Sequence, residues 1–232
     1  MKAVFFDAGP VISLTMNNLL WILPKLKEKF DGDFYITQAV KNEIVDFPLT
    51  TKKFKFEAIQ VLELINNGVI KVADTREIRE TTAHMLGVAN RVFSAHDHNI
   101  NIVQYAEISI LAAVKQFQSN TVVIDEKTTR LLAENPGRLK DILKKNLHTS
   151  ISVNLDMLNE FKKFARGTNI IRSVELAVMA YELGLLDKYI YNKNNYNYGS
   201  EQLLDAVLWG IKLKGCSVSE SEIRRILKIE SR

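Results

Sequence analysis

Apolar runs and apolar helical stripes alternate along the first two thirds of the chain. Short apolar runs predict strands at residues 4–6, 34–37, 69–73 and 121–124, with a further strand expected at 149–153. Stripes of helical spacing predict helices at 19–30, 39–47, 56–66, 77–93 and 103–117. This alternation is typical of an α/β fold with three layers, α/β/α, around a central parallel sheet of about five strands.

The pattern changes near residue 154, after which only helical spacing is found. Helices are predicted at 155–165, 174–186, 201–214 and 220–229. The sequence therefore predicts an α/β domain over residues 1–153 and an all-helical C-terminal extension over 154–232. The apolar stripes of the extension predict packing against the first domain or against a second copy of the chain in a homodimer.

Two aspartates directly follow predicted strands. Asp7 comes after the run 4–6 and Asp125 after the β-branched run 121–124. The carboxyl ends of parallel strands meet at one edge of a sheet, where open α/β sheets bind ligands. Asp7 and Asp125 are therefore expected at the same edge. The pair Gly9-Pro10 after the first aspartate predicts a break in regular structure.

Two glutamates share apolar helical stripes. Glu107 is spaced at i+4 from Val103 and i−3 from Ile110, and Glu43 follows Val40 by three positions. Both glutamates are therefore predicted to face inward. A single acid in such a place is often a helix cap, a turn former or half of a surface ion pair.

Four acids in positions that predict burial need a shared explanation. Moving an ionised carboxylate out of water costs several kcal/mol unless a countercharge and hydrogen bonds offset it. The chain has no comparable set of basic residues to pair with them. A metal ion that several carboxylates bind together provides that countercharge.

The acids lie in the segments FDAGPVISL, ITQAVKNEIVD, AEISILAAV and VVIDEKTTRLLA. In this order, over roughly residues 1–150, the segments resemble the successive acidic blocks of the PIN-domain nucleases. The resemblance implies a compact domain that binds Mg²⁺ or Mn²⁺ and hydrolyses single-stranded or structured RNA. It makes the four acids both metal ligands and catalytic residues: Asp7 and Asp125 are the main ligands, Glu107 completes the site, and Glu43 binds directly or through water and orients the nucleophile.

The chain departs from the family pattern beside two of these acids. Ala8 stands where many members have Ser or Thr, and Glu107 stands where others have Asp. Glu126 follows the last aspartate, where some members have an acid slightly further on. Lys127 and Arg130 are predicted to contact a substrate phosphate, the alternative being ordinary solvated charge on a helix surface.

Composition and charge are those of a globular protein with a mild basic bias. Hydrophobic residues make up 47% and charged residues 25%, and the formal net charge is +4. The lone Cys216 excludes an internal disulfide and a thiolate zinc cluster. No signal-peptide layout and no apolar stretch of membrane-spanning length is found, which predicts a cytoplasmic protein without membrane contact.

Three functions remain open on these residues. The first is a metal-dependent ribonuclease with RNA as its partner, either in RNA processing or decay or as a toxin that an antitoxin protein binds. The second is a phosphatase of the haloacid-dehalogenase class, because AVFFDAG is similar to that family's first strand; Gly9 replaces its second Asp, and no spaced DxxxD follows. The third is a catalytically silent RNA-binding or assembly module, which Ala8 and Glu107 favour.

Overall fold

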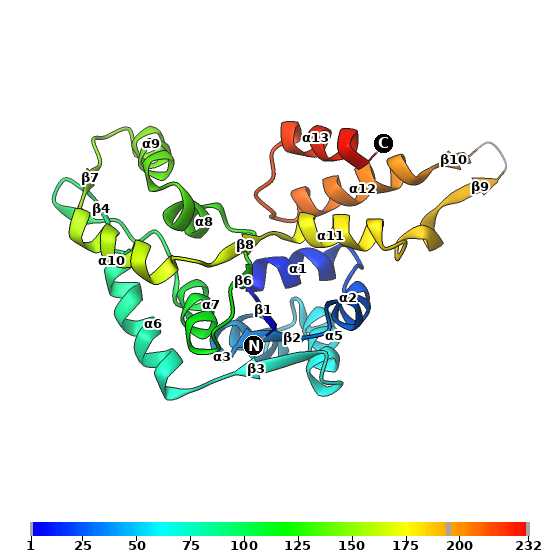
Figure 1. The fold of residues 1–232 in the computed structure, drawn as a ribbon, viewed down its shortest axis with the longest axis horizontal. Helices are drawn as coiled ribbons and strands as arrows, with labels where there is room; N and C mark the ends of the chain where they lie inside the picture. The colour runs from blue at the N-terminus through cyan, green and yellow to red at the C-terminus, as the bar shows by residue number, and fades with distance from the viewer. Residues whose placement is uncertain (1, 194–195, 231–232) are drawn as a thin grey trace.

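The structure is a computed structural model that describes residues 2–193 and 196–230 (Figure 1). Its strands are β1 (Ala3–Phe6), β2 (Asp33–Thr37), β3 (Ile70–Ala73), β4 (Phe93–Ala95), β5 (His98–Asn99), β6 (Thr121–Val123), β7 (Ser152–Val153), β8 (Asn169–Ile171), β9 (Tyr191–Lys193) and β10 (Tyr196–Tyr198). Its helices are α1 (Ala8–Met16), α2 (Ile22–Phe30), α3 (Gln38–Lys41), the π-helix η1 (Asn42–Asp46), α4 (Phe47–Leu49), α5 (Lys55–Asn66), α6 (Arg76–Ala89), α7 (Tyr105–Gln116), α8 (Lys127–Glu134), α9 (Pro136–Leu147), α10 (Leu155–Ala165), α11 (Ser173–Glu182), the 3₁₀ turn η2 (Asp187–Tyr189), α12 (Ser200–Leu213) and α13 (Glu220–Glu230).

The central sheet has five parallel strands in the order β3-β2-β1-β6-β8. This confirms the predicted α/β fold with a central parallel sheet flanked by helices. From β1 the chain builds β2 and β3 on one side, and then crosses to build β6 and β8 on the other. The strand order therefore reverses between β1 and β6, and such a reversal opens a crevice outside the carboxyl ends of the two strands.

Each face of the sheet carries its own pair of aromatic residues. Phe5 and Tyr35 stack with ring centroids 5.1 Å apart, and Phe117 at the end of α7 packs against both rings. Phe6 and Phe34 are their neighbours along the same strands, and the centroids of this second pair also lie 5.1 Å apart. Because successive side chains of a strand point to opposite faces, α7 covers one face and an aromatic residue of α2 packs on the other.

The fifth strand of the sheet corrects a prediction. Residues 149–153 were expected to supply it, but only Ser152–Val153 is extended there, and it pairs antiparallel with β4 in a small separate sheet. Strand β8 takes the place beside β6 instead. The central sheet therefore includes a strand from the segment that was assigned to the helical extension. Only Ile170 and Ile171 are apolar in β8, a shorter run than residues 121–124, from which β6 was predicted.

Helix α1 corrects a second prediction. Gly9-Pro10 was expected to break regular structure, whereas α1 begins at Ala8 with Asp7 as its N-cap. The first N–H groups of an α-helix have no partner within the helix, so a proline in the first turn leaves no hydrogen bond unmade. Pro10 therefore lies within the helix and is buried.

The C-terminal helices stack beside the sheet, as predicted. Figure 1 shows α11 running along α1, with α12 and α13 packed in succession beyond it. Ser219 and Glu222 cap the start of α13 reciprocally, since each backbone N–H donates to the other's side chain. Within the described part of the chain, no helix combines the length and the apolar character that crossing a bilayer requires.

Candidate functional site

One pocket at the carboxyl end of β1 and β6 gathers the four predicted acids. Asp7, Glu43, Glu107 and Asp125 all line it, and its volume is ≈ 300 Å³. The acids come from the junction of β1 and α1, the π-helix η1, the first turn of α7 and the segment after β6. Residues far apart in sequence thus meet where the strand order reverses.

Asp7 is a buried carboxylate with little compensation. Its side chain is 5% exposed, and its own backbone N–H donates to the carbonyl of Val123 at 2.9 Å. Burial raises the pKa of Asp7 to about 7, against a lowering contribution from the N–H of Ala8. The negative charges of Glu107, Glu43 and the second aspartate raise it further. Among the residues that the structure describes, no basic side chain forms an ion pair with Asp7.

Asp125 is equally buried, at 2% exposure, but both oxygens of its carboxylate accept hydrogen bonds. Its Oδ1 accepts a hydrogen bond from the backbone N–H of Ser173 at 2.7 Å. Its Oδ2 accepts from the hydroxyls of Ser173 at 2.6 Å and Ser13 at 2.9 Å. Its backbone carbonyl accepts from the N–H of Ser217 at 3.1 Å. Helices α1 and α11 therefore fix this carboxylate, and the loop before α13 holds the backbone of the same residue.

The first turn of α1 lies close to both aspartates at Gly9. A Cβ atom at this position would lie 3.4 Å from the Cβ of Asp125 and 3.9 Å from Oδ2 of Asp7, which are ordinary van der Waals distances. The glycine that the sequence marked as a chain breaker therefore forms part of the wall of the acidic pocket.

Glu107 is half-buried and caps its own helix. Its Oε2 accepts hydrogen bonds from the backbone N–H of Gln104 at 3.1 Å and from the hydroxyl of Thr129 at 2.7 Å. Burial raises the pKa of Glu107, both hydrogen bonds lower it, and the nearby charges of Glu126 and Glu43 raise it again. The inward orientation predicted for Glu107 is observed, in the form of a helix-capping carboxylate at the pocket wall.

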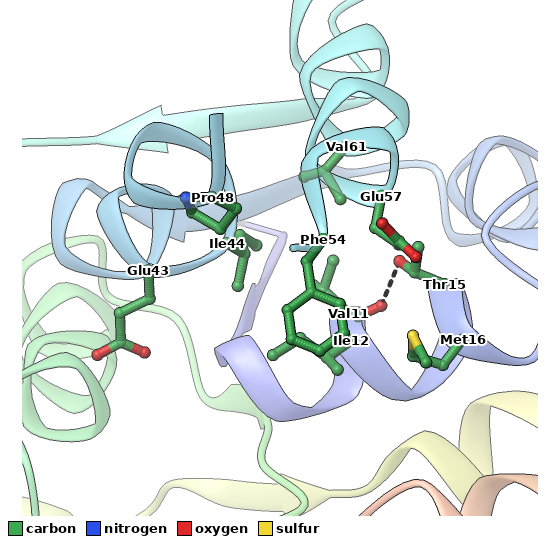
Figure 2. A pocket seen from close by; sticks show the side chains of 10 residues that line it. All are labelled: Val11, Ile12, Thr15, Met16, Glu43, Ile44, Pro48, Phe54, Glu57 and Val61. Atoms are coloured by element: carbon green, nitrogen blue, oxygen red, sulfur yellow. Dashed lines mark hydrogen bonds between the residues drawn. The ribbon is translucent and has the colours of Figure 1, made fainter. Parts of the chain in front are cut away.

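Glu43 departs from its prediction. It was expected to face inward, but the residue is exposed at the rim of the pocket, while Ile44 and Val45 are buried. The cause is the π-helix, whose wider turn shifts the buried positions from those of an α-helix. Partial burial of its side-chain carboxyl group still raises the pKa of Glu43. Figure 2 shows this side chain directed away from the apolar residues Phe54 and Val61.

The predicted phosphate-binding residues lie apart from the acidic pocket. Lys127 is exposed in the first turn of α8, and Arg130 is half-buried with its Nε lacking a hydrogen-bond partner. Neither lines the pocket, whereas Lys214 at the end of α12 does. No local signal marks Lys214, since only the fold of the C-terminal helices brings it to the acids. Ser173 was overlooked for the same reason, because its partner lies 48 positions away in the chain.

The donor chemistry of this pocket suits a hard divalent cation. Within residues 2–193 and 196–230, no three His, Cys, Asp or Glu side chains are placed closely enough to hold one ion together. Mg²⁺ usually keeps several waters and binds proteins through one or two carboxylates. The uncompensated carboxylate of Asp7, with a second carboxylate across Gly9, meets that requirement.

Comparisons with known proteins leave the chain without an assigned relative. No protein-family model, no curated protein and no solved structure matches it. The resemblance of its acidic segments to the PIN-domain nucleases therefore stays a prediction from the sequence.

Proposed function

We propose that this chain is a PIN-like, divalent-metal-dependent ribonuclease that hydrolyses phosphodiester bonds in single-stranded or structured RNA. The observation that carries the proposal is the state of Asp7. It is a buried carboxylate without an ion-pair partner among the described residues, and three further carboxylates share its pocket. A bound cation would offset the cost of burying this charge.

The roles of the acids follow from their surroundings. Asp7 and Asp125 would hold Mg²⁺ or Mn²⁺, and Glu107 would contact the ion through water with its Oε1, because its Oε2 already accepts two hydrogen bonds. The bound ion would neutralise charge that develops on the phosphoryl oxygens. Glu43 is the exposed member of the set and can accept a hydrogen bond from an attacking water. Lys214 supplies a positive charge for the phosphate at the same pocket.

A catalytically silent RNA-binding module is the second candidate. It is favoured by the hydrogen bonds of Asp125 and Glu107, which give both acids a structural task without a metal. In that case Asp7 would remain protonated near neutral pH, as its raised pKa of about 7 permits. The two candidates therefore differ in whether Asp7 exchanges its proton for a cation.

Cleavage and metal binding by matched variants test the proposal. We expect the purified full chain to cleave end-labelled single-stranded RNA in Mn²⁺ or Mg²⁺, and a chelator to stop it. Asp7→Asn should lower the rate at least about 1,000-fold, since loss of a ligand removes the ion that stabilises the transition state. The control is Asp156→Asn, an exposed acid in the first turn of α10 that should keep full activity.

A thermal-shift measurement separates the two candidates. Metal should raise the melting temperature of wild-type protein and of Asp156→Asn, but not of Asp7→Asn. RNA binding with neither cleavage nor a metal-induced shift would replace the nuclease by the silent module. A phosphate group trapped covalently on Asp7 would instead indicate the phosphatase.

A further inference from the structure

An apolar pocket opens directly beside the acidic one. It lies between α1, η1 and the start of α5, and Figure 2 shows the side chains that line it. Its lining is mostly apolar and includes Val11, Met16, Pro48 and Val61. Ile12 and Glu43 line both pockets, so the apolar pocket is adjacent to the acidic one.

Phe54 forms the mouth of this apolar pocket. Its side chain lies next to Val11 and Ile12 in Figure 2, and the residue is 46% exposed. Its backbone has a φ of 62°, in the left-handed region that bulky residues rarely adopt. Such strained residues persist where the surrounding structure holds them, and they gather at binding and catalytic sites.

Three exposed lysines lie close to Phe54 in the sequence, and one of them contacts its ring. Lys52, Lys53 and Lys55 are all exposed, and they flank Phe54 in sequence. The Nζ of Lys53 lies 4.6 Å from the centroid of the Phe54 ring. Proteins that bind single-stranded nucleic acid combine aromatic rings, on which bases stack, with positive charges along the backbone path. The contact of Lys53 with Phe54, together with the charge of Lys52 and Lys55 in the same segment, therefore favours a polyanionic partner for this pocket.

We propose that the apolar pocket is a nucleobase subsite for single-stranded RNA, a substrate assignment that rests on the proposed ribonuclease function. The base beside the cleaved bond contacts Phe54 and the apolar floor formed by Val11 and Ile12. Lys52, Lys53 and Lys55 contact the flanking phosphates. Glu57, which also lines the pocket, can accept a hydrogen bond from an exocyclic amino group of the base.

Equilibrium binding without cleavage tests the subsite. The probe is a fluorescein-labelled RNA octamer of mixed sequence, in chelator, with fluorescence anisotropy as the readout. Phe54→Ala should weaken binding by roughly tenfold, and Phe54→Trp should retain it, because stacking accounts for a large share of such affinity. The matched control is Phe56→Ala, which removes a ring that is 68% exposed and lies outside the pocket. Thermal melting of each variant verifies that the fold is kept.

The outcomes separate this subsite from the ribonuclease function. Binding that depends on Phe54, in a protein that never cleaves RNA with metal, supports the subsite and removes the nuclease. If the protein cleaves RNA with metal, and wild type and Phe54→Ala bind RNA equally well, the nuclease is supported and the subsite is overturned. Absence of RNA binding by wild type up to about 100 μM, far above the usual range for RNA-binding sites, also overturns the subsite. Self-association that Phe54→Ala abolishes, with RNA affinity unchanged, would assign the pocket to a second copy of the chain.

Discussion

The carboxyl ends of β1 and β6 are neighbours in the sheet and each ends in a buried aspartate, yet the two acids differ in nearly everything else. Asp125 accepts hydrogen bonds from Ser13 and Ser173 through both oxygens. Asp7 has no such side-chain partners among the described residues, and its pKa is raised to about 7. The two buried acids therefore differ in how the cost of burial is offset, and the uncompensated one is the better candidate for a functional acid.

The hydrogen bonds of Asp125 also connect the candidate site to the C-terminal helices. The partners of Asp125 come from α1, α11 and the loop that leads to α13, so the C-terminal helices hold one ligand of the proposed site in place. Arg172 reinforces this connection, since its guanidinium donates to Glu175, Glu222 and the carbonyl of Ser217. Under the proposed function, Asp7 exchanges a proton for a cation.

The largest effect is expected from the pH dependence of stability at Asp7. Its pKa in the folded protein lies above the ordinary value of 3.8, so its ionisation destabilises the fold as pH rises from 3.8 through about 7. One pKa unit corresponds to about 1.4 kcal/mol, so the loss in the free energy of unfolding reaches at most about 4 kcal/mol. Asp7→Asn should therefore gain stability relative to wild type across this interval, as measured by urea denaturation at successive pH values.

A comparison of wild type and Asp7→Asn over the same pH range tests whether the raised pKa belongs to Asp7. If wild type and Asp7→Asn lost stability in parallel as pH rises, the assignment of the raised pKa to Asp7 would be wrong. Saturating Mn²⁺ should reduce the difference between the two proteins above pH 7, because the ion offsets the charge only in wild type.

A smaller effect of opposite sign is expected for Asp125→Asn. The amide nitrogen cannot accept a hydrogen bond, so either the backbone N–H of Ser173 at Oδ1 or the two hydroxyls of Ser173 and Ser13 at Oδ2 lose their acceptor, and the carboxylate charge is lost. Hydrogen bonds to charged groups contribute about 1.5–3 kcal/mol each, so we expect the free energy of unfolding at pH 7.5 to fall by about 3 kcal/mol. A variant as stable as Asp7→Asn in the same urea titration would show that the two strand ends are equivalent.

The smallest effect is expected for Ser173→Ala. The substitution removes the hydroxyl that donates to Oδ2 and keeps the backbone N–H that donates to Oδ1. We expect a loss of about 1.5 kcal/mol in the free energy of unfolding. As a positioning residue, Ser173 should also affect kcat more than KM in RNA cleavage. Ser13→Ala, which removes the longer of the two hydroxyl contacts, is the matched comparison and should cost less. Equal costs, or a change in KM alone, would contradict this role.

The sequence by itself determined the alternation of strands and helices and the presence of two aspartates directly after neighbouring strands. These features depend on local periodicity, which the chain displays in strands β1, β2, β3 and β6 and in the helices between them. It also indicated that Glu107 faces inward, and the structure places this residue half-buried at the pocket wall. Its expectation for Glu43 failed, because a π-helix leaves no recognisable spacing in the sequence.

Only the tertiary structure decided which strand completes the sheet, which lysine reaches the pocket, and which aspartate is compensated. β8 has only two apolar residues and so gives no local signal, and Lys214 reaches the pocket only through the packing of α12. The hydrogen bonds to Asp125 join residues 48 and 112 positions apart. The free energy of a buried charge depends on such partners, and a pattern of neighbouring residues cannot name them.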